Sequence, residues 1–557
     1  MNTHLGFRNE FGVNTFFNKY ALARNDTWSM MAYRLVEYVA GYGEGLYHNP
    51  LMSKDERRRL EYFIDRKMFI PGGRYLYYVG RLLRAYNNCY LLRAEEDTRE
   101  EWARLMHAST SCLMLGGGIG IDYSRLRPSG TPLRRTGGIA SGPLPLMDAV
   151  NELGRNVMQG GSRRSAIYAS LHWAHEDISR FLQTKNWTDQ VRANKEADFN
   201  AKAPLDMTNI SVNYDDTCFD ADGNWKPEAM DVFIQNCKQA LETGEPGFSF
   251  NFNGRELETL RNACTEVTSE DDSDVCNLGS VNMGEINDIE TFREVVHLGS
   301  KFLVCGTMRA DLPYQRVYDV RAKNRRLGLG LMGIHEWLLK QGSGYEVTPE
   351  LHNYLAVYES ESEAAANEHC DRLYLNRPAA YRAIAPTGSI GILAGTTTGI
   401  EPLFAVAYKR RYLTEGTKWK YEYVVDSTAE YLMAECEAKP EDIETSYSLA
   451  NSIEGWEKRI AFQADVQRYV DMSISSTINL PAWGSNANNN DKVQDFSTLL
   501  STYGKQLRGF TCYPDGARGG QPLVEVSYEE AKKHKGVITE ETPDICDITG
   551  HGGVCGS

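Results

Sequence analysis

The chain has 557 residues, of which 42% are hydrophobic and 24% are charged, and its formal net charge is −15. A chain of this length buries a large core and is expected to form more than one domain. The acidic balance argues against a protein that binds DNA or RNA, because phosphate contacts need an excess of Lys and Arg. No apolar run is as long as a membrane span, and the N-terminus lacks the apolar stretch of a secretory signal, so a cytoplasmic location is expected.

Three regions follow one another along the chain. Residues 1–70 are predicted to be helical, because two segments, WSMMAYRLVEYVAGYGEGLY and KDERRRLEYFIDRKMF, carry apolar residues about 3.6 positions apart. Over residues 71–525, short apolar runs, Gly-rich turns and helical stretches alternate, which indicates an α/β fold with mostly parallel strands. Residues 526–557 are polar and end in TGHGGVCGS, which predicts a flexible tail.

Twelve cysteines are too few for a secreted fold held together by disulfides. Most are expected to be buried as small hydrophobic residues. Five differ, because each lies beside Gly, Asn or acidic residues in a stretch without periodicity. These candidates for chemistry are Cys89, Cys264, Cys276, Cys546 and Cys555.

The segment RNACTEV places Asn262, Cys264 and Glu266 at alternate positions. On an extended strand or loop, alternate residues share one face. A thiol that becomes a thiyl radical can take a hydrogen atom from a sugar carbon, while the carboxylate takes a proton from the neighbouring hydroxyl and the amide holds an oxygen. The alternative is a surface loop with one buried cysteine.

Two further cysteines stand in polar settings. Cys276 follows Cys264 by twelve residues in DSDVCNLGSVNM, after the polar stretch TSEDDSD that can reverse the chain. Cys89 in NNCYLL precedes an apolar run and is otherwise a cysteine at the start of a strand. Together the two can form a dithiol that closes to a disulfide while it delivers two electrons. The sequence leaves open whether they meet.

Glycine-rich turns provide candidate nucleotide contacts. In APTGSIGILAG, a turn enters a predicted helix and presents free backbone N–H groups, which suits a phosphate; an ordinary capped turn is the alternative. The run GGGIGIDYS permits a close backbone approach to a ligand. The loops at 137–143 and 160–166 flank a helix predicted over 143–158, and Arg163 and Arg164 can grip an anion there, unless these are simply solvated basic loops.

The tail pairs Cys546 and Cys555 around His551. The spacing C-x4-H-x3-C is compatible with zinc, although a fourth ligand is missing nearby, so no metal site is assigned. A reducing arm that visits the active site is the alternative that the two thiols favour.

Taken together, the ordered segments NNCYLL, GGGIGIDYSRLRPSG, GGIASGP, RNACTEV, CNLGSVNM and PTGSIG resemble the catalytic chain of a ribonucleotide reductase. The resemblance covers most of the chain from Pro71 to Gly520. It implies a ten-stranded α/β barrel made of two five-stranded parallel halves, with Cys264 at the tip of a central finger loop. The activity that it implies is the reduction of ribonucleotides to 2′-deoxyribonucleotides.

The resemblance also implies roles for these residues. Cys264 would carry the thiyl radical that abstracts the 3′-hydrogen, Glu266 would be the base on the 3′-hydroxyl, and Asn262 would be its hydrogen-bonding partner. Cys89 and Cys276 would be the local dithiol. Substrate contacts are implied at Asn88, Gly117, Gly118, Pro386, Thr387, Gly388, Ser389 and Ile390.

The family more often has N-P-C-G-E around the radical cysteine, whereas Ala263 and Thr265 stand here in place of Pro and Gly. Members with a separate radical subunit usually carry an adjacent pair of tyrosines late in the barrel. The corresponding stretch, RGFTCYPDGARGGQPL, has only Tyr513, beside Cys512. It resembles the adenosylcobalamin-dependent group, known as class II, although no cobalt ligand can be identified. The alternatives are a class I-type large subunit that needs a metal-radical partner subunit, and a catalytically silent nucleotide-binding homologue.

The resemblance implies partners as well. A deoxynucleotide triphosphate or ATP would bind as effector at the two Gly/Arg loops and select the substrate. The short distance from Gly118 to Gly142 leaves no room for the insertion of the monomeric enzymes, so a homodimer is expected. Thioredoxin or glutaredoxin would recharge the tail cysteines.

Overall fold

The structure is a computed structural model and describes residues 6–8, 10–157, 165–198, 201–414, 418–435, 438–517, 523–534 and 537–540. The chain divides into two compact units. The larger unit comprises residues 1–187, 203–404 and 444–517, and the smaller one comprises residues 188–202, 405–443 and 518–557. The boundaries expected at residues 70 and 525 stay predictions.

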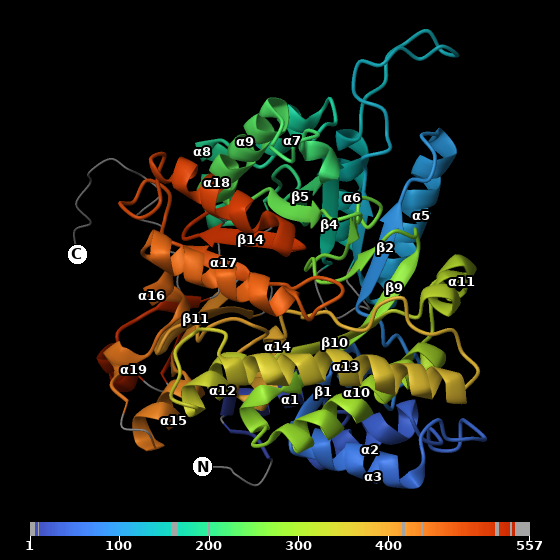
Figure 1. Ribbon diagram of the computed structural model, residues 1–557, viewed down its shortest axis with the longest axis vertical. Helices are drawn as coiled ribbons and strands as arrows, with labels where there is room; N and C mark the ends of the chain where they lie inside the picture. Colours follow the sequence, from blue (N-terminus) through green and yellow to red (C-terminus); the bar gives the residue numbers. More distant parts are fainter. Residues whose placement is uncertain are drawn as a thin grey trace, which may run out of the picture. The chain divides into compact units, whose positions relative to one another are not determined.

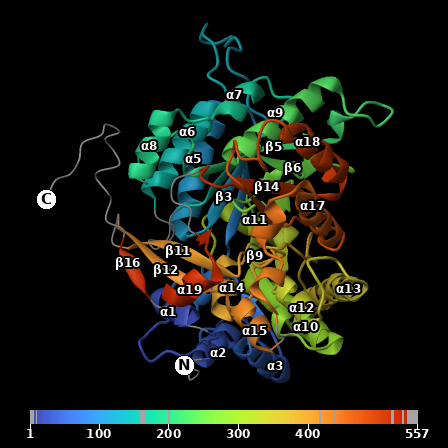
Figure 2. The ribbon, with the colours of Figure 1, turned by 90° about the vertical axis from the view of Figure 1, so that its left-hand side faces the viewer.

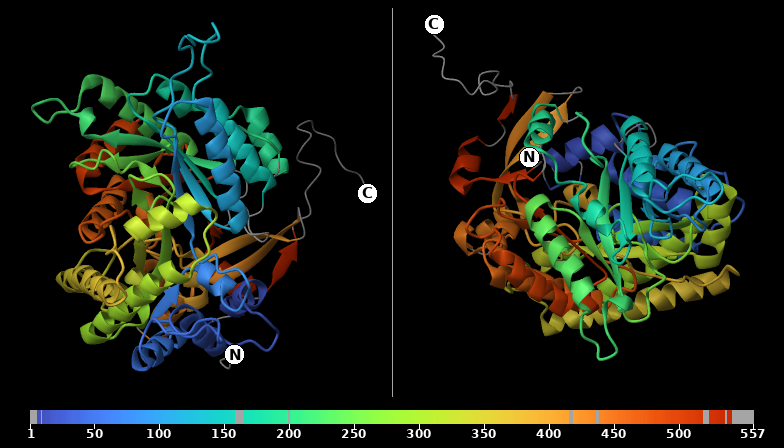
Figure 3. Two further views of the ribbon diagram at one scale, coloured as in Figure 1. Left: turned by 90° about the vertical axis from the view of Figure 1, so that its right-hand side faces the viewer. Right: turned by 90° about the horizontal axis from the view of Figure 1, so that it is seen from above.

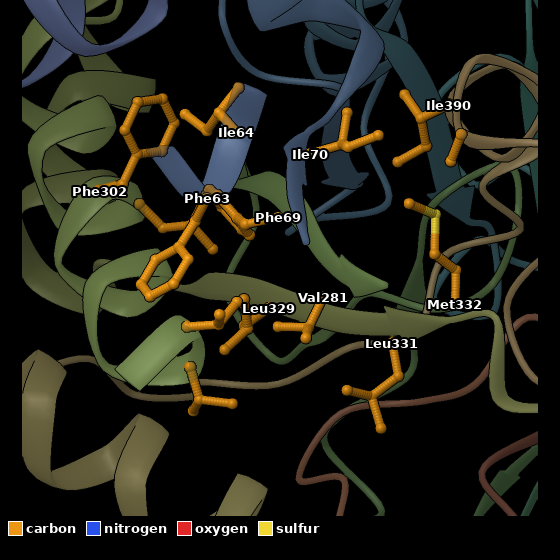
Figure 4. Packing of buried hydrophobic residues seen from close by; sticks show 14 of the residues in the cluster. Phe63, Ile64, Phe69, Ile70, Val281, Phe302, Leu329, Leu331, Met332 and Ile390 are labelled. Carbon is orange, nitrogen blue, oxygen red and sulfur yellow. The ribbon is translucent and has the colours of Figure 1, made fainter. Parts of the chain in front are cut away.

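The N-terminal region is helical, as its periodicity predicts, with α1 (Glu10–Lys19), α2 (Trp28–Val39) and α3 (Lys54–Asp65). Thr27 caps α2, and a capping box between Ser53 and Glu56 begins α3, so backbone N–H groups at both helix starts are satisfied. The apolar faces of these helices enter one core with the short strand β1 (Phe69–Pro71) and the second half of the barrel. Figure 4 shows the side chains that meet there: Phe63, Ile64, Phe69, Ile70, Val281, Phe302, Leu329, Leu331, Met332 and Ile390.

Five parallel strands form the first half of the barrel, in the sheet order β2 (Cys89–Arg93), β3 (Gly118–Asp122), β4 (Ile167–His172), β5 (Thr208–Asp215) and β6 (Gly247–Asn251). Helices connect successive strands and cover their outer faces, as the blue-to-green helices around the strands in Figure 3 show. They are α5 (Arg99–Leu115), α6 (Leu144–Asn156), α7 (Ile178–Gln183) and α9 (Pro227–Thr243). The alternation of strand and helix signals in the sequence is confirmed here.

The second half contains the parallel pairs β9 (Asp274–Asn282) with β10 (Leu327–Met332), and β13 (Thr477–Leu480) with β14 (Gly509–Pro514). Between the two pairs, single bridges at Leu329–Arg382 and Ile384–Ile474 continue the parallel pattern. The halves join by antiparallel pairing of β2 with β9 and of β6 with β14.

The α/β barrel expected from the resemblance is thereby confirmed. The ten hydrogen-bonded strands include β1, which adds antiparallel to β9, while the third strand of the second half is reduced to bridges. The helices of this half, all of them labelled in Figure 1 except α4, follow β1 or lie between and around these strands. They are α4 (Gly73–Tyr78), α10 (Ile289–Arg309), α11 (Gln315–Asn324), α12 (Ile334–Lys340), α13 (Pro349–Arg372), α14 (Gly388–Ala394), α16 (Ser446–Ala450), α17 (Ile453–Gln467) and α18 (Lys492–Tyr503).

The smaller unit has its own antiparallel sheet, in the order β15 (Leu523–Glu525), β11 (Ala407–Thr414), β12 (Lys418–Val425) and β16 (Ile538–Glu540). Helix α19 (Tyr528–His534) packs on β11 and β12 (Figure 2). The unit also contains α8 (Asp189–Ala197) and α15 (Ser427–Glu435). Across the described parts of both units, no helix combines the length and the apolar character that crossing a bilayer requires.

A finger loop, residues 252–273, connects β6 to β9. Its two short strands, β7 (Leu260–Arg261) and β8 (Thr268–Ser269), pair as a small hairpin that packs against β2 and β3. The contact requires glycine at position 120, because a Cβ there would lie 1.6 Å from the carbonyl oxygen of Arg261. The glycine run at 116–120 therefore admits the chain's own finger loop at this position.

Substitution Gly120→Ala is expected to push the finger loop off β3 and to lower the free energy of unfolding by about 1–3 kcal/mol, the usual cost of overpacking. Gly138→Ala is the matched control, since a Cβ there meets nothing within 4 Å; its effect should stay within about 0.5 kcal/mol. Urea unfolding of both variants tests this. Equal stability of the two would show that the finger loop does not depend on this contact.

Candidate functional site

Two of the predicted cysteines face each other across the seam between the two halves of the barrel. Cys89 is the first residue of β2, and the register of the antiparallel pair sets it directly opposite Cys276 of β9. Opposed residues of such a pair have Cα atoms about 4.5–5.5 Å apart, which lies inside the range of about 4.4–6.8 Å that a disulfide needs. Both are free, buried thiols. The fold therefore places opposite each other two cysteines whose meeting the spacing of the residues left open.

The tip of the finger loop carries the other three predicted residues. The Asn262 amide Nδ2 donates to Cys89 Sγ at 2.9 Å and to Glu266 Oε2 at 2.8 Å. Glu266 Oε1 lies 4.0 Å from the same sulfur. Asn262 and Glu266 are buried, whereas Cys264 is exposed.

The tip is a tight turn, closed by the hydrogen bond from Thr265 N to Asn262 O at 2.9 Å. Reversal of the chain, and not the alternation of an extended strand, sets Asn262 beside Glu266. Thr265 has φ +69°, which lies in the left-handed region that favours glycine. A Thr in this conformation has a steric cost that a Gly at the same position would not have. Two bonds from the barrel hold the tip: Asn209 Nδ2 donates to Ala263 O at 3.1 Å, and Ser473 N donates to Glu266 O at 2.9 Å.

The electrostatics of the site follow from burial. Burial raises the pKa of Glu266 to about 7, against the opposing effect of its hydrogen bond from Asn262. Burial also raises the pKa of Cys89 well above its ordinary value, and the nearby Glu266, Cys264 and Cys276 raise it further. The Cys276 pKa is raised in the same way, first by burial and then by Asp274 and Glu266. At neutral pH the dithiol is therefore protonated, and Glu266 is poised between acid and base.

Of the predicted substrate residues near Cys89, the two glycines contact neighbouring parts of the chain, whereas Asn88 has an unpaired side-chain oxygen. Gly118 pairs with Cys89 in the ladder between β2 and β3, and its N–H donates to Asn88 O at 2.8 Å. A Cβ at Gly117 would lie 2.1 Å from the ring of Tyr90, so this glycine accommodates a neighbouring side chain. Asn88 Oδ1 is buried without a partner among the described residues. Contact of these residues with substrate stays a prediction.

The predicted phosphate turn lies at the start of α14. Thr387 has φ +49°, and its Oγ1 accepts a hydrogen bond from Gly399 N at 2.8 Å, which ties the turn to the loop after the helix. Pro386 and Gly388 are exposed, Ser389 is half-buried, and Ile390 enters the core. The exposed part of the turn is thus open to a ligand, and phosphate binding there stays a prediction.

The stretch expected to carry a tyrosine pair forms β14. Thr511 and Tyr513 are half-buried, while Cys512 between them is buried and donates to Ala240 O of α9 at 3.4 Å. Cys512, which the sequence left undecided, packs against an outer helix. Arg163, Arg164, Cys546 and Cys555 lie outside the described residues, so their predicted roles stay predictions.

One part of the site had no signal in the sequence. Arg261, directly before Asn262, is 1% exposed, and its Nη2 donates to Asn251 Oδ1 at 2.6 Å. Arg508 Nη2 pairs with Glu258 Oε2 at 2.6 Å at the root of the same loop. These arginines anchor the finger loop to β6 and to the start of β14. Local sequence patterns do not predict this role, because the partners of the arginines are distant in the sequence.

Comparison of the sequence with models of known protein families finds a match. The family described as ribonucleotide reductase, barrel domain, matches residues 87–226, 213–354 and 376–513. The chain belongs to the ribonucleotide reductase family. The match covers β2 to β14, including both cysteines of the seam and the finger loop.

Relatives extend over most of the chain. It is 27% identical to the vitamin B12-dependent ribonucleoside-diphosphate reductase of Mycobacterium tuberculosis (strain CDC 1551 / Oshkosh) over 541 residues, 86% of this chain and 74% of the relative. It is 25% identical to the protein of the same name from Thermoplasma acidophilum over 544 residues, 86% of this chain and 68% of the relative. The ribonucleoside-diphosphate reductase large subunit of Vaccinia virus (strain Copenhagen) is 26% identical over 374 residues, 58% of this chain and 47% of the relative.

Mild oxidation is expected to join Cys89 to Cys276 in preference to other described cysteines, because the ladder already holds them opposite each other. Peptide mapping after diamide treatment and alkylation should find this cross-link in the wild type and lose it in Cys276→Ser. Cys237→Ser, in which a buried cysteine of α9 is changed, is the control and should keep it. A wild-type protein whose Cys89 is still alkylated in denaturant after oxidation would contradict the pairing.

Proposed function

We propose that this chain reduces ribonucleotides to 2′-deoxyribonucleotides through a thiyl radical on Cys264, with adenosylcobalamin as the radical source. The observation that carries the proposal is the Asn262 amide, which bonds at once to the Cys89 thiol and to the Glu266 carboxyl. Cys276 lies across the ladder from that thiol. Base and dithiol are thus held together beneath the exposed Cys264.

The groups divide the reaction among them. The Cys264 thiyl takes the 3′-hydrogen of the ribose while the Glu266 carboxylate accepts the proton of the 3′-hydroxyl. The 2′-hydroxyl then leaves as water. Cys89 and Cys276 supply two electrons and two protons and end as a disulfide, and Cys264 returns the hydrogen atom to C3′. The balance is one ribonucleotide and two thiols converted to one deoxyribonucleotide, one disulfide and water.

The exposure of Cys264 fits an external radical source. Adenosylcobalamin, when bound, supplies the one-electron chemistry that removes a hydrogen atom from a thiol. The chain's own contribution is to present Cys264 to it and to keep Cys89 and Cys276 buried. The relatives from Mycobacterium tuberculosis and Thermoplasma acidophilum, named as vitamin B12-dependent, support this cofactor, and so does β14, where Tyr513 has no tyrosine as a sequence neighbour.

Two alternatives to an adenosylcobalamin-dependent reductase differ from it in what they need for activity. The Vaccinia relative is named as a large subunit, so a chain that needs a metal-radical partner subunit is the second candidate. A silent nucleotide-binding homologue is the third, and the assembled Asn262, Cys264 and Glu266 speak against it.

We also infer a homodimer, with a deoxynucleotide triphosphate or ATP as effector. Met114 of α5 is exposed, whereas Trp102 and Met106 of the same helix are half-buried against the chain's own core. A second copy that packs on this helix would cover Met114. The loop at 137–143 and the loop at 160–166, which contains Arg163 and Arg164, would hold the effector. Thioredoxin or glutaredoxin would reduce the disulfide through Cys546 and Cys555.

Purified chain supplied with a ribonucleoside diphosphate and dithiothreitol is expected to form deoxyribonucleotide only when adenosylcobalamin is added. Cys264→Ser should abolish product and leave nucleotide affinity within about twofold, because the exposed side chain changes little in size. Cys512→Ser is the matched control and should stay active. Turnover by Cys264→Ser would refute the radical assignment, and turnover that requires an added radical subunit would favour the second candidate.

The rate should rise with pH through the pKa of Glu266, about 7. Below that pH the carboxyl is protonated and cannot accept the 3′-hydroxyl proton, so one unit lower the rate should be about tenfold below its plateau. Glu266→Gln should lose about 10²–10⁴-fold in rate together with this pH dependence. Initial rates from pH 5.5 to 8.5, with circular dichroism at each pH as a check of folding, measure both effects. A flat profile in the wild type would exclude Glu266 as the base.

A further inference from the structure

Four arginines surround the last residues of α10 and the segment that follows them, Thr307–Leu312, away from the radical site. They are Arg84, before β2; Arg309, at the end of α10; and Arg321 and Arg325, at the end of α11 and just after it. Figure 1 shows α10 and α11, which carry or adjoin three of them. No role in the proposed reaction uses this cluster.

Two of the arginines meet at Tyr47. Arg84 forms an ion pair with Asp311, with Nη2 and Oδ1 2.6 Å apart, and its Nη1 donates to Tyr47 Oη at 2.9 Å. The guanidinium of Arg309 lies 3.3 Å from the centre of the Tyr47 ring and donates to Asn49 O at 3.2 Å. Tyr47 thus contacts both cations.

The other two arginines approach the segment from α11. Arg325 Nη1 donates to Thr307 Oγ1 at 2.7 Å. Arg321 lies over the ring of Tyr318, 5.6 Å from its centre, and Tyr318 Oη accepts a hydrogen bond from Leu312 N at 2.9 Å. All four side chains are therefore tied to residues 307–312 or to a side chain bonded to them.

The cluster lacks negative charge. Among the ion pairs of the described residues, Asp311 is the only acidic partner of these four arginines, and it pairs with Arg84. Burial lowers the pKa of Arg309, Arg321 and Arg325, and the charge of Arg325 lowers that of Arg321 further. The C-terminal end of α10 contributes about half a negative charge, which is far short of three cations.

The cluster also has N–H groups without acceptors. In the part of the chain that the structure describes, Arg309 Nε, Arg321 Nε and Arg321 Nη1 are buried and have no hydrogen-bond partner. A buried donor that stays unpaired destabilises the folded state, more so when it is charged, so such groups call for a ligand or an ion. Arg321 has two of them in one side chain.

We propose that this cluster binds an oxyanion, namely a phosphate that is free or carried by a nucleotide. Such a group offers several acceptor oxygens and two negative charges, which match the unpaired guanidinium N–H groups and the missing counter-charge. None of its residues belongs to the substrate turn at 386–390 or to the loops at 137–143 and 160–166.

Hydrogen exchange at peptides covering residues 305–325 tests the proposal in the full-length chain, with inorganic phosphate or ATP as the probe and sodium chloride at matched ionic strength as the blank. Wild-type protein should show slower exchange at these peptides with phosphate than with chloride. Arg321→Gln should need at least about tenfold more phosphate for the same protection. Arg377→Gln, which changes an exposed arginine paired with Asp371, is the control and should behave as wild type.

The arms separate the two sources of phosphate. Equal protection by ATP and inorganic phosphate assigns the site to free phosphate, whereas protection at lower concentration of ATP assigns it to a nucleotide. No protection by either probe in the wild type, or the same protection in Arg321→Gln, would overturn the proposal. If Arg321→Gln does not fold, as judged by thermal unfolding without phosphate, Arg309→Gln carries the same expectation.

Discussion

The antiparallel pairing of β2 with β9 is the constraint on which the site depends. It joins the two halves of the barrel, and its register sets Cys89 opposite Cys276. A slip of one residue would turn Cys276 to the other face of its strand, toward the outer helices and away from the interior. The redox pair therefore lies on a seam that cannot shift without opening the barrel. This explains how two residues so distant in the sequence are held opposite each other.

The finger loop depends on the same seam, because it packs on β2 and β3 and presents its tip to Cys89. Space for it comes from Gly120, and its anchorage comes from Arg261 and Arg508. Burial of the tip has a direct chemical result. The desolvation that makes Glu266 costly to ionise also brings its pKa to about 7, where a carboxyl can both take and return a proton. Packing and reactivity are thus set by one placement of the loop.

The sequence predicts the alternation of strands and helices, the α/β barrel and the cysteines worth attention, because periodicity and polar neighbours are local properties. It cannot predict register, so the meeting of Cys89 with Cys276 had to come from the fold. It also suggested that alternation would gather Asn262 and Glu266, whereas a turn with a left-handed Thr265 does so. Gly120 was interpreted as room for a ligand, and it makes room for the finger loop. Arg261 and Arg508 escaped notice because their partners are brought to them only by tertiary packing.

The three cysteines of the site divide into one exposed thiol and two buried ones, and this division has a physical logic. A thiol that must lose a hydrogen atom to an external radical source has to be accessible, as Cys264 is. The dithiol, in contrast, must not react with other disulfides or metals before the substrate radical has formed. Burial raises the pKa of Cys89 and Cys276, so thiolate, the form that attacks disulfides and metals, is scarce at neutral pH. Both thiols then keep the hydrogen atoms that a radical intermediate needs, and their protection comes from the same low-polarity surroundings that tune Glu266. One arrangement therefore accounts for both environments: the finger loop packs on the β2–β9 seam, which buries Cys89 and Cys276 and leaves Cys264 exposed at the tip.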